Sequence, residues 1–151
     1  MTTRRRFLER SLLTVCGCLG LAAAARGAPQ ERAGDDIAGV WLTEAGDSKV
    51  EIRGNGGVWG GKVVWLATPE REGAPIQDVK NVDTSLRGRP IMGLEVLEGF
   101  ARNGEGTWGG GTIYSPRQGK SFPAGIRLSG TNRLEITVNA RLISKTVVWT
   151  R

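Results

Sequence analysis

The sequence of 151 residues contains no histidine, and its two cysteines, Cys16 and Cys18, both lie close to the N-terminus. Histidine and cysteine are the side chains that most often serve as general base, nucleophile or soft-metal ligand. No recognisable catalytic signature surrounds Ser115, Ser121 or Ser144 either. We therefore expect no enzymatic activity, no cofactor and no bound metal.

Residues 1–25 have the pattern of a cleavable export signal. An arginine-rich head leads into an apolar run from Leu12 to Ala25, which is too short to span a bilayer comfortably. Small residues close the run and predict cleavage near Ala25, or at Ala28. We expect a periplasmic protein whose mature chain has no transmembrane segment and has lost both cysteines.

The head of this signal also suggests an export route. The sequence Thr3-Arg4-Arg5-Arg6-Phe7-Leu8 resembles a twin-arginine signal, which is read by a receptor that exports folded proteins, although Glu9 stands where a basic residue is common. A general secretory signal with an arginine-rich head is the alternative. A lipid anchor on Cys18 is a weaker interpretation, because the apolar run continues past that residue.

The charge of the mature chain is moderate. Removing the four arginines and one glutamate of residues 1–25 lowers the net charge from +6 to +3. The remaining basic residues are scattered, without a run of five lysines or arginines. A nucleic-acid partner is therefore not expected.

Beyond a polar segment at 26–36, expected to be a flexible mature N-terminus, the pattern is one of short strands in a single domain at 37–151. Apolar Leu134, Ile136 and Val138 alternate with polar neighbours, and the same alternation occurs around Val50 and Ile126. Such a period of two predicts strands with one buried and one wet face. No segment shows a helical stripe over three turns.

Glycine-rich turns separate these strands and predict an antiparallel meander. Gly54–Gly57, Asn103–Gly106 and Gly130–Asn132 all favour the positive φ of tight hairpins. The longest break, Ala67 to Pro90, exceeds a hairpin loop, and Asp83–Leu86 within it is suited to one capped helical turn. We expect an all-β, up-and-down barrel of about eight strands, with a two-sheet sandwich as the alternative.

The two ends of the barrel domain carry a further signal. Gly39-Val40-Trp41 opens the first strand, and Trp149-Thr150-Arg151 closes the last one. This is similar to the lipocalin arrangement, in which an arginine from the last strand stacks on the tryptophan of the first. We interpret Gly39, Trp41, Trp149 and Arg151 as structural residues, with a stacking contribution of about 1 kcal/mol.

A more specific resemblance covers nearly all of the mature chain. The matching segments are Gly39–Thr43, Gly61–Leu66, Leu86–Pro90, Gly93-Leu94, Trp108–Tyr114, Pro116, Gly119-Lys120 and Trp149–Arg151. In order and spacing they resemble the bacterial domain-of-unknown-function family 2147 (DUF2147). The resemblance implies an exported, lipocalin-like barrel without an established role. The resemblance also implies a cysteine pair in many members, at the positions of Asn55 and Gly60. If that pair forms a disulfide in the family, this chain does without it, and its second and third strands are expected to open more easily.

Six residues are candidates for a ligand site at one barrel mouth. Trp65, Trp108 and Tyr114 are predicted to form an apolar wall, although aromatic side chains in a small barrel also serve as core. Arg87 and Arg89 lie two apart and, in an extended stretch, point the same way as a fork for an anion. Lys120 is a further polar anchor, with a solvated hairpin as the alternative.

The acidic residues are further candidates for chemistry. Asp78, Asn81 and Asp83 lack the spacing of a calcium loop, and we expect them to cap local turns and pair with the arginines. Glu95 and Glu98 are three apart, which in a regular strand places them on opposite faces and rules out an acid–base pair. These patterns leave a binding protein as the main hypothesis.

The sequence thus predicts a periplasmic barrel, monomeric or weakly self-associating, that binds a small hydrophobic or anionic ligand at one mouth. The alternative is a filled barrel that acts as an interaction module in the cell envelope. In that case the 67–90 loop contacts a protein partner. An empty apolar cavity favours the first hypothesis, and a packed interior beside an exposed apolar loop favours the second.

Overall fold

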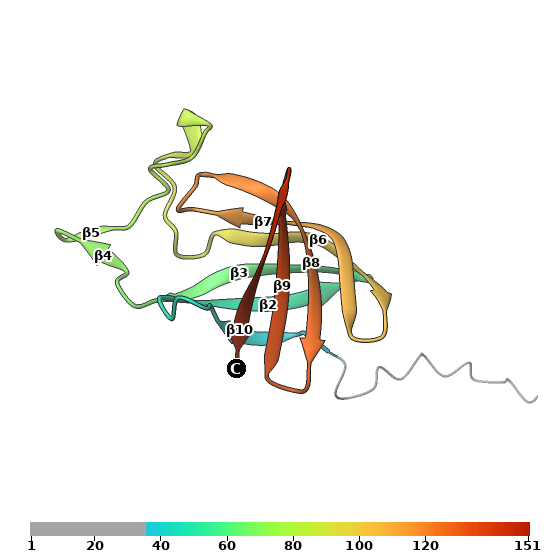
Figure 1. Cartoon of the computed structure of the whole chain (residues 1–151). Coiled ribbons are helices and arrows are strands. Elements are labelled where there is room, and N and C mark those ends of the chain that lie inside the picture. The colour runs from blue at the N-terminus through green and yellow to red at the C-terminus, as the bar shows by residue number, and fades with distance from the viewer. Residues whose placement is uncertain (1–35) are drawn as a thin grey trace, which may run out of the picture. The chain divides into compact units, whose positions relative to one another are not determined.

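Eight strands in the computed structural model, which describes residues 36–151, pair into one closed antiparallel barrel (Figure 1). Their order around the barrel is β1-β10-β9-β8-β7-β6-β3-β2, so each strand neighbours the next one along the chain except where β4 and β5 are inserted. The bounds are β1 Gly39–Leu42, β2 Ser48–Asn55, β3 Val58–Leu66, β6 Glu95–Gly104, β7 Thr107–Ser115, β8 Lys120–Ser129, β9 Arg133–Ala140 and β10 Ile143–Thr150. The predicted all-β, up-and-down barrel is confirmed, and closure rules out the sandwich.

The alternating segments became strands because each has one face to bury. In β9, Leu134 and Ile136 are fully buried while Arg133 is exposed. The β2–β3 turn consists of Gly56 and Gly57, both at positive φ, as the hairpin requires. The expected signal peptide at 1–25 and the expected flexible segment at 26–36, apart from Asp36, lie outside the described residues.

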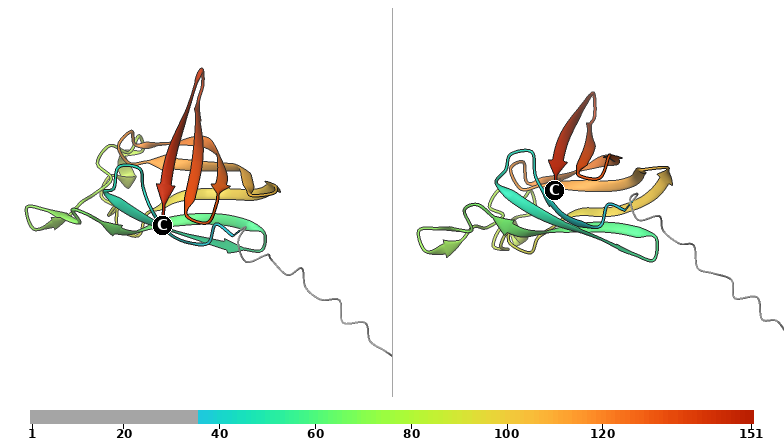
Figure 2. Two further views of the ribbon diagram at one scale, coloured as in Figure 1. Left: turned by 60° about the horizontal axis from the view of Figure 1, so that its bottom comes forward. Right: turned by 90° about the horizontal axis from the view of Figure 1, so that it is seen from below.

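The antiparallel order gives the barrel two different ends. Three tight turns, between β2 and β3, β6 and β7, and β8 and β9, lie at one end together with the start of β1 and the end of β10; we call this the closed end. The β1–β2, β3–β6, β7–β8 and β9–β10 connections lie at the other, the open end. The β9–β10 hairpin projects well beyond the neighbouring strands (Figure 2).

The β3–β6 connection folds over the open end with little regular structure. It contains a two-stranded hairpin, β4 Glu70–Arg71 and β5 Ala74–Pro75, and one 3₁₀ turn, η1 Thr84–Leu86. The carboxylate of Asp83 caps this turn by accepting a hydrogen bond from the backbone N–H of Ser85 at 2.9 Å. The predicted capped helical turn is therefore confirmed.

Two β-bulges change which side chains face inward. The β2–β3 register shifts beside Val64, and Trp65 consequently faces outward, 40% exposed, against the ammonium group of Lys49. The expectation that Trp65 forms part of the inner wall is therefore wrong. Its position on the outside follows from the extra residue in β3.

A second bulge corrects the expectation for the two glutamates of β6. The β3–β6 register shifts between Gly61 and Lys62, so the consecutive residues Val96 and Leu97 are both buried. Glu95 and Glu98, which a regular strand would place on opposite faces, are both exposed.

Candidate functional site

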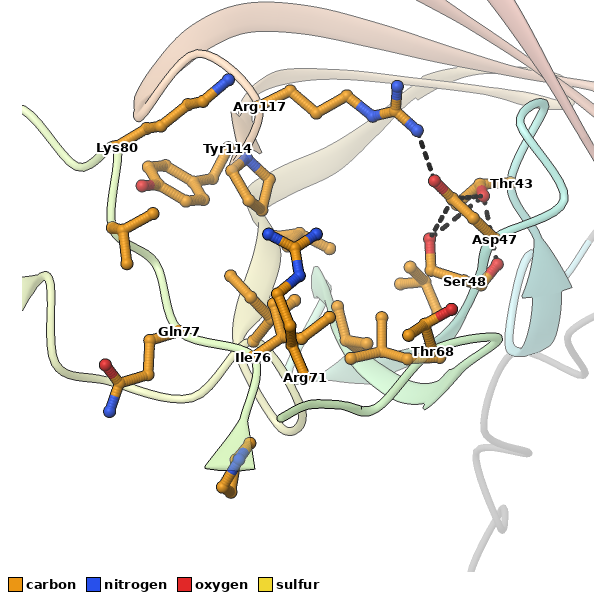
Figure 3. Close-up of a pocket in the computed structure, with 18 of the residues that line it drawn as sticks. Thr43, Asp47, Ser48, Thr68, Arg71, Ile76, Gln77, Lys80, Tyr114 and Arg117 are labelled. Carbon is orange, nitrogen blue, oxygen red and sulfur yellow. Dashed lines mark hydrogen bonds and ion pairs between the residues drawn. The ribbon is translucent and has the colours of Figure 1, made fainter. Parts of the chain in front are cut away.

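The open end contains a pocket of about 640 Å³ (Figure 3). It is lined by the β1–β2 turn, the first half of the β3–β6 connection, the β7–β8 turn and the interior of the barrel. The apolar lining side chains are Val50, Val63, Leu66, Ala74, Pro75, Ile76, Val79, Ile91, Val96, Ile113, Pro116 and Trp149. A volume in this range is typical of sites for small molecules.

The floor of the pocket is the hydrophobic core itself. Val50, Val63 and Val96 belong to the buried core cluster, and they also line the pocket. Trp149, near the C-terminal end of β10, contributes to the same floor and is 5% exposed. An apolar molecule that enters the pocket would therefore extend the core contacts instead of meeting a polar surface.

One side of the rim is fixed by an ion pair. Asp47 accepts hydrogen bonds from Arg117, across the barrel mouth, and from the hydroxyl of Ser48 at 3.1 Å. Partial burial acts to raise the pKa of Asp47, but the hydrogen bonds from Arg117 and Ser48 outweigh it and hold the pKa below its ordinary value. Arg117 is thus already neutralised by a partner within the rim.

Two other basic side chains reach the pocket from the β3–β6 connection. Arg71 projects from β4 toward the centre of the pocket, and Lys80 approaches from the segment that follows β5 (Figure 3). Among the described residues, neither has a hydrogen bond or ion pair from its charged group. Sequence reasoning missed both, since they lie in a stretch without periodicity.

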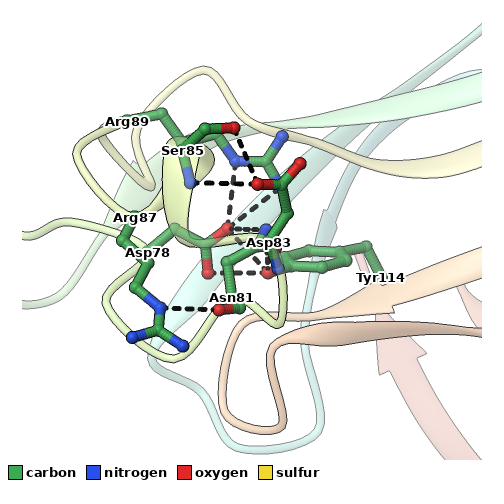
Figure 4. Close-up of polar contacts among 7 residues, drawn as sticks. All are labelled: Asp78, Asn81, Asp83, Ser85, Arg87, Arg89 and Tyr114. Atoms are coloured by element: carbon green, nitrogen blue, oxygen red, sulfur yellow. Dashed lines mark hydrogen bonds and ion pairs between the residues drawn. The ribbon is translucent and has the colours of Figure 1, made fainter.

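A polar cluster ties the β3–β6 connection to the barrel wall (Figure 4). Asp78, whose side chain is fully buried, accepts hydrogen bonds from the hydroxyl of Tyr114 at 2.6 Å, from the amide of Asn81 at 2.8 Å and from Nε of Arg89 at 3.0 Å. Asn81 also donates to the Tyr114 hydroxyl at 2.9 Å. We call Asp78, Asn81, Arg89 and Tyr114 the anchor cluster.

The charges of the anchor cluster reinforce it. Burial and the hydrogen bond to Asp78 both raise the pKa of Tyr114, so the phenol stays protonated and keeps donating. Burial acts to lower the pKa of Arg89, but the bond to Asp78 outweighs it and raises the pKa overall. Within residues 67–90, Asp78 and Asn81 are the two buried side chains, so polar contacts hold this connection in place.

The backbone of the segment that carries the anchor cluster packs closely against the backbone of the β7–β8 turn. The backbone N–H of Val82 donates to the carbonyl of Gly119 at 3.0 Å. Gly119 has a φ of +69°, and a Cβ there would lie 1.7 Å from the carbonyl oxygen of Lys80. Only glycine therefore fits this position without moving the connection.

The two predicted anchoring arginines do not form a fork. Arg89 binds Asp78, and Nε of Arg87 donates to the carbonyl of Asn81 at 2.8 Å. Arg87 has a helical backbone, with φ −67° and ψ −20°, because it follows directly on η1. The extended conformation that would align residues 87 and 89 is absent at this point. The expectation that arginines pair with Asp78 and its neighbours is met.

The remaining predicted site residues lie in different places. Tyr114 belongs to the anchor cluster and also lines the pocket. Trp108 is buried at the closed end, near the start of the same strand β7, and its ring packs edge-on against Trp59. Lys120 stacks over Phe122 and lines a second, smaller pocket of about 290 Å³, together with Glu95 and Glu98.

The structural residues at the closed end have the expected arrangement. The guanidinium group of Arg151 lies 4.4 Å from the centre of the Trp41 ring and donates to the carbonyls of Ala38 and Thr131. Gly39 has a φ of +129°, and a Cβ there would press on Arg151 at 3.2 Å. The predicted stacking of the last arginine on the first tryptophan is therefore confirmed.

Across residues 36–151, no three of the side chains that commonly bind metals lie close enough together to hold an ion. The same part of the chain contains no helix with the length and apolarity of a membrane span.

Comparisons with known proteins agree with this architecture. A family model described as "Uncharacterized protein conserved in bacteria (DUF2147)" matches residues 39–151. A similar solved structure is that of protein HP1028 from the human pathogen Helicobacter pylori, which is described as belonging to the lipocalin family. The TM-score is 0.66 at 21% identity, over 77% of this chain and 82% of that one. Curated proteins give no match. The structural likeness establishes a lipocalin-like fold.

Proposed function

This chain belongs to the bacterial DUF2147 family, and from that premise we propose that it binds a small, partly apolar molecule in the open end of its barrel. The observation that carries the proposal is the pocket of about 640 Å³ whose floor is made of core side chains. An eight-stranded barrel is just wide enough either to be filled by its own side chains or to hold one small ligand. Here the closed end is filled and the open end is not.

The proposed site keeps one residue of the sequence-based prediction and replaces the rest. Tyr114 remains in the wall, while Trp149 and Ile113 take the place of Trp65 and Trp108. Arg87 and Arg89 bind partners within the β3–β6 connection and do not line the pocket. Binding, not catalysis, is the proposed activity, in keeping with a sequence that has no histidine.

We also propose that the protein works in the periplasm. Support comes from the arginine-rich head and the apolar run of residues 1–25, which have the pattern of an export signal. A barrel that carries apolar molecules would have a use in that compartment, since such molecules need shielding from water between two membranes.

Native mass spectrometry of the protein purified from its own cells tests the binding proposal. Ala74 is exposed and lines the pocket, so A74W places a bulky ring in the mouth without touching the core. Ala101 is exposed on β6 and lines neither pocket, which makes A101W the matched control. We expect a stoichiometric small-molecule adduct on the wild type and on A101W, and none on A74W. A bare wild-type mass, even after incubation with an envelope lipid extract, would contradict the proposal.

A second candidate function has its own observation. Val79 is 62% exposed and Val82 is 70% exposed, and both lie on the 67–90 loop. Neighbouring exposed aliphatic side chains of this kind are typical of protein-binding surfaces. If the loop is the contact surface of an envelope interaction module, V82S, which leaves the pocket lining intact, should weaken in-cell cross-linking to one defined partner, whereas A74W should not.

A further inference from the structure

The cations around the pocket fall into two groups. Arg117 is paired with Asp47, Arg89 with Asp78, and Arg87 with a backbone carbonyl. Arg71 and Lys80, in contrast, make no hydrogen bond or ion pair through their charged groups within residues 36–151. The first group holds the fold together, and the second group is available to a ligand.

The two available cations stand over an apolar floor. Arg71 comes from β4 and Lys80 from the segment after β5, and both line the pocket; Figure 3 shows Arg71 directed into its centre and Lys80 at its edge beside Tyr114. The apolar part of the same lining includes Val63, Ile113 and Trp149. An apolar body on this floor would place one polar end of the molecule at the level of the two cations.

We propose that the ligand is a monoanionic acid with an aliphatic body, and that Arg71 and Lys80 bind its carboxylate. This inference rests on the proposed function and gives its ligand a chemical class. A guanidinium group binds a carboxylate through two parallel hydrogen bonds, and an ammonium group adds a point charge.

The net charge of the side chains that line the pocket favours a ligand with one negative charge. The side chains lining the pocket that are charged at neutral pH are Asp47, Arg71, Glu72, Lys80 and Arg117, and their formal charges sum to +1. Glu72, in the turn next to Arg71, opposes a second negative charge on the ligand. A phosphate monoester carries about −1.5 to −2 at neutral pH and is therefore a poorer match than a carboxylate.

Calorimetric titration with four probes of equal chain length tests this class: decanoate, decyl phosphate, decanol and decyltrimethylammonium. We expect decanoate to bind best. R71A and K80A should each weaken decanoate binding about tenfold and leave decanol binding unchanged, since a charge-assisted hydrogen bond at a partly exposed site is worth roughly that factor. R71K should recover part of the loss. Arg127 is exposed on β8 and lines neither pocket, so R127A is the matched control.

The outcomes separate this inference from the proposed function. If decanol binds and decanoate binds no better, or if R71A and K80A leave decanoate binding intact, the carboxylate assignment fails and the apolar pocket stands. Tighter binding of decyl phosphate or of decyltrimethylammonium also overturns the assignment. If none of the four probes binds, both proposals fail. Circular dichroism melting of each variant confirms that folding is unchanged.

Discussion

At the closed end of the barrel, tight turns and buried tryptophans fill the interior, whereas at the open end a long connection borders a pocket. Both ends are built from the same alternating strands. They differ in what holds them: aromatic packing at the closed end, and a polar cluster around Asp78 at the open end. The comparison indicates that stability is concentrated at one end, which leaves the other free to bind.

The seam between the first and last strands sharpens this contrast. β1 and β10 pair through one residue couple, Leu42 with Thr150, whereas β2 and β3 pair along their whole length. Side chains compensate at the closed end, where Arg151 bridges the carbonyls of Ala38 and Thr131 and covers Trp41. Arg151 therefore ties the last strand to the first at the closed end, and we call Arg151, its stacking on Trp41 and its bonds to the carbonyls of Ala38 and Thr131 the clasp.

Truncation of a closed-end tryptophan should have the largest effect. Trp41 is fully buried and donates a hydrogen bond to the carbonyl of Ile37, so W41A should lower the free energy of unfolding by about 3–5 kcal/mol. W65A, the matched change on the outer face, should cost less than about 1 kcal/mol. Urea unfolding measures both, and equal losses would refute the concentration of stability inside the closed end.

Substitution of Gly119 should loosen the open end selectively. G119A forces the backbone of Lys80 to move, and the left-handed φ adds strain, so we expect a loss of about 2–3 kcal/mol. Gly46 has a similar φ of +70° with open space around it, and G46A should cost only about 1 kcal/mol. Hydrogen exchange should accelerate at Val82 in G119A alone. Unchanged protection of the Val82 amide in G119A would mean that the packing of the β3–β6 connection against the β7–β8 turn does not stabilise the open end.

Removal of Arg151 tests the clasp. R151A loses the stacking on Trp41 and two hydrogen bonds to backbone carbonyls, which should cost about 1–2 kcal/mol. We expect faster hydrogen exchange in β1 and β10, with the pocket unaffected. R127A serves as the control for loss of an exposed arginine, and identical exchange in the two variants would count against the clasp.

The smallest expected effect is a change in alkaline stability. The pKa of Tyr114 is raised in the folded state by burial and by its bond to Asp78, so its contribution is complete below about pH 10 and is lost as pH rises through the folded pKa. Y114F should lose about 1 kcal/mol at pH 7 and show a shallower fall in melting temperature between about pH 9.5 and 11. If the melting temperatures of the wild type and Y114F fall equally steeply over this pH range, ionisation of the Tyr114 phenol does not affect stability.

The sequence predicted those parts of the molecule that depend on local pattern. Alternation around Ile136 indicated a strand with one buried face, and the terminal Trp41 and Arg151 indicated the clasp. Trp65 escaped prediction because its orientation depends on an extra residue in the pairing of β3 with β2, which no single segment reveals.

The binding site was harder to predict than the fold. Arg87 and Arg89 were expected to align, but η1 gives Arg87 a helical backbone that separates them. Trp108 and Tyr114 lie on one strand, yet six residues of extended chain put them about 20 Å apart, near opposite ends of the barrel. Arg71 and Lys80 lie in a connection whose course is set by the tertiary contacts of Asp78.

Amide and indole chemical-shift mapping on the isotope-labelled protein, titrated with decanol, tests the central contrast most directly. The account predicts shifts at Val63, Ile113 and the indole N–H of Trp149, which line the pocket, and none at the indole N–H of Trp41 or Trp108. Shifts confined to the closed end, or no shifts at saturating decanol, would contradict a barrel that is packed at one end and open to a ligand at the other.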